Sequence, residues 1–325
     1  ITKFSQLSIF SELNNISNIS MKDDYAGICG ITETELLDDM QDGIAGLAQA
    51  NELTPRQVVA KLKENYDGYH FSAHSPGVFN PFSLLSSLAN KDFDSYWFAS
   101  GTPTYLVNML QRFNVQPASL QRMCAKSSAF DSPTETMKTI TPLLYQSGYI
   151  TIKGYDKISQ LYTLDLPNKE VKVGLFESLL PNYLDGSYAE QGDVAIARMS
   201  VLIRQNDIDG ALRLLQTFLA TVPYCNVTNH EGHYQQMLFI IFTLLTHYVV
   251  DVEVHTPKGR VDIVMLTADR LYLIELKLNK DADAAMKQID LKNYAERFAL
   301  SGKLITKVGI NFDSSVGNIT DWRIA

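Results

Sequence analysis

Residues 259–278 read GRVDIVMLTADRLYLIELKL. Two runs rich in Val, Ile and Leu flank Ala268-Asp269, a pattern that predicts two β-strands joined by a tight turn. Asp262 interrupts the first strand and Glu275 interrupts the second, at equal distances from the turn. We therefore expect the two carboxylates to approach one another across a hairpin.

The second strand carries charge on one face only, because successive side chains of a strand point to opposite sides. Glu275 and Lys277 share a face with Leu271 and Leu273, and the other face is apolar. In the structural interpretation, Glu275 and Lys277 form a surface ion pair and Asp262 caps a turn. In the functional interpretation, two converging acids repel and need a cation between them. Their oxygen ligands favour a hard ion, Mg²⁺ or Mn²⁺.

The functional interpretation predicts phosphodiester hydrolysis. Lys277 would orient or help deprotonate a water, and the ion would offset the charge that builds on the phosphate. In the functional interpretation, Gln288 on the helix that follows contacts the phosphate or Lys277. In the structural interpretation, Gln288 belongs to a solvated helix face. Glu231, in the first turn of an earlier helix, is either a further metal ligand or an acid that complements the helix dipole. His230 and His233 have no third ligand near them in the sequence, so we expect no zinc site.

The C-terminal region has the element order αβββαβ, typical of a compact α/β domain with a mixed sheet. We expect a helix over 234–248, strands over 249–255, 260–267 and 271–278, a helix over 282–300 and a strand over 305–312.

The upstream part is mostly helical. Thr32 and Glu35 have capping-box spacing, and Thr54-Pro55 suits a helix N-cap followed by its first residue. A helix over 134–145, ended by Gly148, precedes a hairpin of residues 149–153 and 160–166. This is the outline of a winged helix, although its helix carries only one basic residue, Lys138, that could contact DNA. A packing module is the plainer interpretation.

The composition, with 46% hydrophobic and 20% charged residues, is that of a globular protein. We expect four segments, 1–114, 115–185, 186–222 and 223–325. No apolar run approaches the ~20 residues of a membrane span. Three widely spaced cysteines favour a reducing, cytoplasmic setting. The chain contains no phosphate-binding loop of the Gly-x-x-x-x-Gly-Lys-Ser/Thr type, so we expect no ATP site in it.

The net charge of −8 argues against a protein coated in basic surface for nucleic acid. Residues 222–325 carry 11 Lys and Arg against 12 Asp and Glu, however, so the acidity lies mainly upstream. A local basic groove in the C-terminal region remains compatible with this balance.

Several motifs together resemble the PD-(D/E)XK nuclease superfamily, in the branch fused to AAA-ATPase-like proteins of Bacteroidetes. The C-terminal motifs are Gly259-Arg260-Val261-Asp262, Ile274-Glu275-Leu276-Lys277 and Met286-Lys287-Gln288-Ile289. The upstream motifs are Tyr66-Asp67-Gly68-Tyr69-His70-Phe71, Phe79-Asn80-Pro81-Phe82 and Tyr145-Gln146-Ser147-Gly148-Tyr149.

The resemblance implies a restriction-endonuclease-like fold for 223–325, with Asp262 and Glu275 as metal ligands, Lys277 as the catalytic group, Gln288 as a supporting residue and Glu231 as the weakest match. It implies a DNase or RNase, with DNA favoured as the partner. It also implies that 1–114 are the end and helical lid of an AAA-ATPase-like module, followed by a winged helix (115–185) and a helical connector (186–222). The chain starts at Ile1 without Met, as a C-terminal fragment of a longer protein would. The alternative is a regulatory module that binds nucleic acid or protein without cutting; the near-neutral charge of 222–325 favours it.

Overall fold

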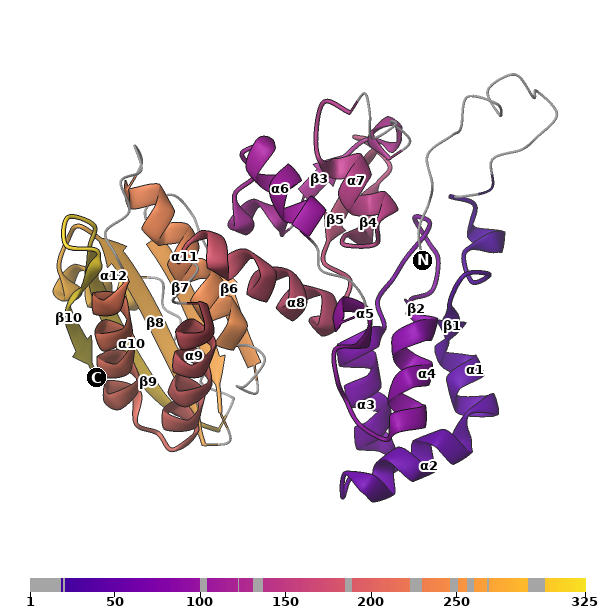
Figure 1. Cartoon of the computed structure of the whole chain (residues 1–325), viewed down its shortest axis with the longest axis horizontal. Helices are drawn as coiled ribbons and strands as arrows, with labels where there is room; N and C mark the ends of the chain where they lie inside the picture. Colours follow the sequence, from indigo (N-terminus) through magenta and orange to yellow (C-terminus); the bar gives the residue numbers. More distant parts are fainter. Residues whose placement is uncertain are drawn as a thin grey trace. The chain divides into compact units, whose positions relative to one another are not determined.

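The computed structural model describes residues 19, 21–99, 104–121, 123–130, 137–184, 189–222, 230–245, 251–255, 260–267, 269–291 and 302–325. The chain divides into two compact units, Ile1–Leu175 and Phe176–Ala325 (Figure 1). Among the described residues, no helix combines the length and the apolar character that a membrane crossing requires.

The N-terminal unit consists of short helices with two small sheets. One sheet pairs β1 with β2, and the other has the order β3-β5-β4. Its elements are η2 (Asp23–Tyr25), β1 (Ile31–Thr32), α1 (Glu33–Asp39), α2 (Gln41–Ala50), α3 (Pro55–Tyr66), β2 (Val78–Phe79), α4 (Pro81–Asn90), α5 (Tyr96–Ala99), α6 (Thr104–Arg112), η3 (Pro117–Leu120), β3 (Met123–Ala125), η4 (Ser127–Ala129), α7 (Thr141–Gln146), β4 (Thr151–Asp156) and β5 (Leu161–Asp165). The following helix, α8 (Lys169–Leu179), spans the division between the units.

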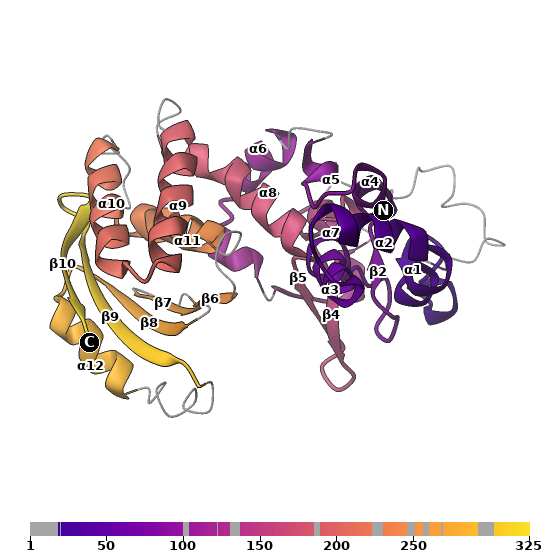
Figure 2. The same ribbon diagram turned by 90° about the horizontal axis from the view of Figure 1, so that it is seen from below.

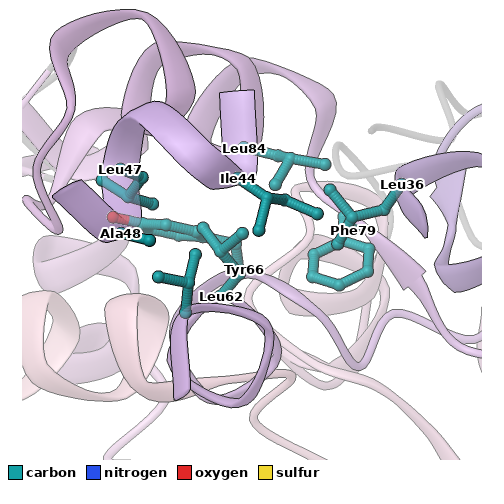
Figure 3. Close-up of a cluster of buried hydrophobic side chains, with 9 residues drawn as sticks. Leu36, Ile44, Leu47, Ala48, Leu62, Tyr66, Phe79 and Leu84 are labelled. Atoms are coloured by element: carbon teal, nitrogen blue, oxygen red, sulfur yellow. The ribbon is translucent and has the colours of Figure 1, made fainter. Parts of the chain in front are cut away.

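Helices α1 to α4 enclose a hydrophobic core (Figure 3). The predicted N-termini of α1 and α3, two of the helices around this core, are confirmed. Thr32 and Glu35 form a capping box at the start of α1, and Thr54 caps α3, whose first residue is Pro55. The core side chains are Leu36, Ile44, Leu47, Ala48, Val58, Leu62, Tyr66, Phe79 and Leu84.

The predicted hairpin is present as β4 and β5. The predicted helix is shorter than expected, because α7 begins at Thr141 and residues 137–140 before it are not helical. Gly148, with φ of 80°, follows the end of α7, as the sequence indicates. A third strand that was not predicted joins this hairpin, because β3 pairs with β5 and makes a three-stranded sheet. Residues 131–136, which include the predicted start of the helix at 134, lie outside the described part of the chain.

A buried carboxylate joins α4, α5 and α8 within the N-terminal unit. Glu170 of α8 accepts a hydrogen bond from the Ser83 hydroxyl at 2.7 Å and another from the backbone N–H of Trp97, also at 2.7 Å. Burial raises the pKa of the Glu170 carboxyl. The carboxylate therefore connects the buried Ser83 of α4 and the partly buried Trp97 of α5 to α8.

Replacement of Glu170 by Ala removes both acceptors at once. We expect Glu170→Ala to lower the free energy of unfolding by about 1–3 kcal/mol, because Ser83 and the Trp97 N–H lose their partner. A urea titration of the full chain measures the change. As a control, Glu64→Ala removes only an exposed ion pair with Lys169 and should cost less than about 1 kcal/mol. Equal effects of the two variants would contradict the assigned role.

The raised pKa of Glu170 also predicts a pH dependence. Between the unfolded-state value of 4.5 and the higher native pKa, the native state binds more protons than the unfolded state. The contribution of this group to stability therefore falls as the pH rises through that window. Glu170→Gln cannot titrate, so we expect the stability of wild type relative to Glu170→Gln to decrease over this interval. A flat difference would show that the carboxyl is not perturbed.

The C-terminal unit is built on one five-stranded sheet of order β10-β9-β8-β7-β6. Its strands are β6 (Asp251–His255), β7 (Arg260–Leu266), β8 (Arg270–Leu278), β9 (Leu304–Asp313) and β10 (Asn318–Ile324). Its helices are η5 (Leu180–Asn182), α9 (Ala189–Arg204), α10 (Ile208–Thr221), α11 (His230–Leu244) and α12 (Ala282–Leu291). The sheet is mixed, as predicted, because β8 and β9 are parallel and the other pairs are antiparallel.

The predicted order αβββαβ is correct from α11 to β9 but stops one strand too early. Strand β10, Asn318–Ile324, pairs with β9 and closes that edge of the sheet. Its sequence contains Asp321 and Arg323, and most of its side chains are at least partly exposed. A short polar edge strand lacks the apolar run that marks a strand in sequence, which is why the prediction ended at 312.

Helices cover both faces of the sheet, as Figure 2 shows, with α9, α10 and α11 on one face and α12 on the other. Helix α10 is tied to β10, since Gln216 donates to the carbonyl of Ile319 and the Trp322 indole donates to Asp209. Residues 186–222, expected as a connector, thus contribute a layer to this unit.

Candidate active site on the second and third strands of the C-terminal sheet

The central hairpin is formed by β7 and β8. Asp262 pairs directly with Glu275, and Arg260 pairs with Lys277. The turn is closed by a hydrogen bond of 2.9 Å from the Thr267 N–H to the carbonyl of Arg270. The predicted hairpin is confirmed, and directly paired residues of an antiparallel ladder share a face of the sheet. The side chain of Asp262 lies outside the described part of the structure.

Glu275 and Lys277 form a buried ion pair. Lys277 Nζ lies 2.5 Å from Glu275 Oε1, and the side chains are only 8% and 1% exposed, respectively. The structural interpretation is therefore wrong in expecting a surface ion pair, and its expectation that the Asp262 side chain caps a turn lies outside the described part of the structure. The pair is inside the fold, and Asp262 lies within β7. Burial of two charges costs free energy that a well-packed apolar pair would not, so their presence favours a functional reason.

The face that carries Glu275 is covered by α12. Leu271 and Leu273, on the same face of β8, pack against Ile289 of α12. The opposite face of β8 points toward α9, α10 and α11 (Figure 2). On that face the Tyr272 hydroxyl donates a hydrogen bond of 3.2 Å to the side chain of Asn206, which lies between α9 and α10. Burial raises the pKa of this phenol. Glu275 and Lys277 thus lie on the same face of β8 as the apolar residues that pack between the sheet and α12.

The sequence prediction missed two residues of β9 that lie beside the pair. Gly309 is in register with Glu275, and Asn311 is in register with Lys277. A Cβ at Gly309 would lie 2.6 Å from the carbonyl oxygen of Ala282, so only glycine lets α12 approach this closely. The predicted strand 305–312 also contains Thr306 and Lys307, so its sequence does not single out Gly309 and Asn311.

Asn311 braces the end of β8. Its side chain is buried, accepts a hydrogen bond from the Lys280 N–H at 3.0 Å and donates to Thr320 at 2.9 Å. These contacts connect β9 with the segment between β8 and α12 and with β10. The chain just after Lys277 is therefore held in place.

Gln288 lies on the flank of α12 and is partly buried. Ala282, Ala285 and Ile289 are the buried residues of that helix. Asp283, on the other flank, contacts Arg323 of β10. Gln288 therefore lies on the flank of α12 opposite to the one that contacts β10.

Glu231 belongs to α11, which packs on the sheet face opposite to the Glu275–Lys277 pair. The ring of Tyr234, one turn later, lies 5.1 Å from that of Phe312 near the end of β9. The start of α11 is thus near the end of the sheet that carries the pair. The side chain of Glu231 lies outside the described part, and its metal role stays a prediction.

His233 is a packing residue in the structure. Its ring contacts Tyr183 and Tyr234, and its Nε2 lies 3.2 Å from the carbonyl oxygen of Tyr183. Among the side chains that the structure describes, no three from His, Cys, Asp and Glu converge on one point. That set does not contain the side chains of Asp262 and Glu231.

A side chain at Gly309 should disturb the site through α12. We expect Gly309→Ala to lower stability by about 1–3 kcal/mol, because the new methyl group meets backbone atoms of the helix that cannot swing aside. Thermal unfolding of the full chain measures the loss. Gly154→Ala is the matched control, since its nearest neighbour would be 3.9 Å away. A Gly309 variant as stable as this control would contradict the proposed close contact.

Comparisons with known proteins agree with this geometry. Residues 229–322 match the family model described as the PD-(D/E)XK nuclease superfamily. The chain is 30% identical, over 321 residues and 96% of its length, to an uncharacterized protein in the vnfD 5′ region of Azotobacter chroococcum mcd 1. The chain spans 59% of the length of that relative. No solved structure gave a significant match.

Proposed function

Because residues 229–322 are a PD-(D/E)XK nuclease superfamily domain, we propose that this domain hydrolyses phosphodiester bonds of nucleic acid with the help of a divalent metal ion. The observation that carries the proposal is the buried Glu275–Lys277 pair directly across from Asp262. DNA is the favoured substrate, and Mg²⁺ or Mn²⁺ the favoured ion.

The donor set fits such an ion. Glu275 is a carboxylate with a side chain only 1% exposed, and the Lys277 ammonium beside it indicates that this position accepts a cation. Asp262 is its direct partner in the ladder. Carboxylate oxygens are the protein ligands that Mg²⁺ prefers, with water and substrate phosphate completing its shell. Asp262 and Glu275 would hold the ion, with Glu231 as a candidate third ligand.

The residues around the ion have separate tasks in this proposal. When bound, the ion would act as a Lewis acid toward the phosphate and lower the pKa of water. Lys277 would hold the attacking water through its ammonium hydrogens. Gln288 would donate a hydrogen bond to the phosphate from the flank of α12. The layer formed by Leu271, Leu273 and Ile289 keeps bulk water from the buried side of the pair.

We also propose an upstream organisation from the same resemblance. Residues 1–114 would be the end and helical lid of an AAA-ATPase-like module and 115–185 a winged helix, whereas the helices of 186–222 belong to the C-terminal unit. The greater length of the Azotobacter relative is compatible with a further module in the whole protein. Such a module would govern the access of nucleic acid to the site.

A second function, nucleic-acid or protein binding without cleavage, is favoured by the charge of the domain. Several of its basic side chains are already paired with acids. Lys307 contacts Asp290, and Arg323 contacts both Asp321 and Asp283. These pairs leave less positive charge for phosphates than a basic groove would offer.

A cleavage panel separates the two functions. The full chain is incubated with supercoiled plasmid, linear duplex DNA, single-stranded DNA and RNA, in Mg²⁺, in Mn²⁺ or in EDTA. We expect metal-dependent cleavage that Asp262→Ala, Glu275→Ala and Lys277→Ala each reduce by about a hundredfold or more. Lys280→Ala, an exposed lysine just beyond β8, is the matched control and should keep its activity.

Two results would reject the nuclease proposal. Cleavage that persists in Glu275→Ala and Lys277→Ala would come from another site or from a contaminant. Binding of nucleic acid without cleavage under every metal condition would establish the second function instead.

A further inference from the structure

We propose that Lys277 is a built-in competitor of the metal ion, so that the Glu275–Lys277 pair sets how tightly the ion is held. This inference rests on the proposed function, because it concerns the same site. It adds a regulatory role to the lysine, which limits the affinity of the site for the ion as well as serving the reaction.

The competition follows from the position of the ammonium. Lys277 Nζ lies 2.5 Å from Glu275 Oε1, a carboxylate oxygen that the proposed function assigns to the ion. A magnesium ion would lie about 2.1 Å from a ligand oxygen. Both cations on the same carboxyl group would be only a few ångströms apart and would repel strongly in a site screened from water. Full engagement of the ion therefore requires Lys277 to move from Glu275.

The surroundings of the pair make the competition strong and the movement possible. Glu275 is nearly inaccessible, and a positive charge beside its carboxylate offsets the cost of burying it. The lysine has a flexible four-carbon stem whose ammonium can turn toward a water or a phosphate. Asn311, its neighbour in β9, has partners in Lys280 and Thr320, which fix the backbone while the side chain moves.

The pair also has a consequence for folding. Lys277 satisfies the buried carboxylate when the ion is scarce, so the fold does not depend on metal. Loss of the ammonium would remove a positive charge 2.5 Å from the buried Glu275 carboxylate, a destabilising change. Binding of a cation to the folded state alone would then restore stability. The same substitution should therefore weaken the fold and strengthen metal binding.

Calorimetric titration of the full chain with MgCl₂, without nucleic acid, tests this. We expect Lys277→Met to bind Mg²⁺ about tenfold more tightly than wild type, within the usual range of coupling between two sites. Lys280→Met, which removes an exposed positive charge three residues away, should bind like wild type. Thermal unfolding should show a lower melting temperature for Lys277→Met without added ion and a larger increase with Mg²⁺.

The outcomes distinguish this inference from the proposed function. If wild type binds Mg²⁺, Glu275→Gln loses that binding, and Lys277→Met binds no more tightly than wild type, the competition is refuted and the metal site stands. If neither wild type nor Lys277→Met binds Mg²⁺, the proposed function fails together with the inference. If Lys277→Met does not fold, Lys277→Gln replaces it, because glutamine keeps a hydrogen-bond donor but carries no charge. Tighter Mg²⁺ binding by Lys277→Gln than by wild type then supports the competition, and equal or weaker binding refutes it.

Discussion

The structure of the C-terminal unit depends on the stabilisation of a buried ion pair, Glu275–Lys277, in the middle of its sheet. Strand β8 is apolar on one face and carries Glu275 and Lys277 on the other, under a helix. Isolated, either charge would cost several kcal/mol in such a place. The ammonium at 2.5 Å compensates the carboxylate, and the neighbouring strands and α12 are arranged around that pair. A fold selected for stability alone would more simply use two apolar residues here.

Other features of the unit serve to hold this pair. Gly309 has no side chain, and α12 therefore sits directly on the sheet beside Glu275. Asn311 fixes the exit from β8 by its bond to the Lys280 N–H. Helices α9 to α11 cover the reverse face (Figure 2). The charged pair is thus supported on both sides of the sheet, which gives it the defined geometry that the proposed catalysis would require.

The sequence predicted the hairpin well, because its signals are local. Asp262 and Glu275 are equidistant from the turn, so the register follows from counting residues, and alternation along β8 places Glu275 and Lys277 on one face. The neighbours from β9 could not be predicted in this way. The register of a parallel strand depends on the crossover through α12, which simple counting does not give. The role of Glu170 was also hidden, since its donors, Ser83 and the Trp97 N–H, come from distant parts of the chain.

The central claim is that Asp262 and Glu275 hold one divalent ion between neighbouring strands. The most direct measurement is anomalous X-ray diffraction from crystals of the full chain grown with Mn²⁺. We expect an anomalous peak between the two strands, with oxygens of both carboxylates at about 2.1 Å from the ion. A peak bound only by other residues, or Asp262 and Glu275 carboxylates directed into separate surroundings, would contradict it.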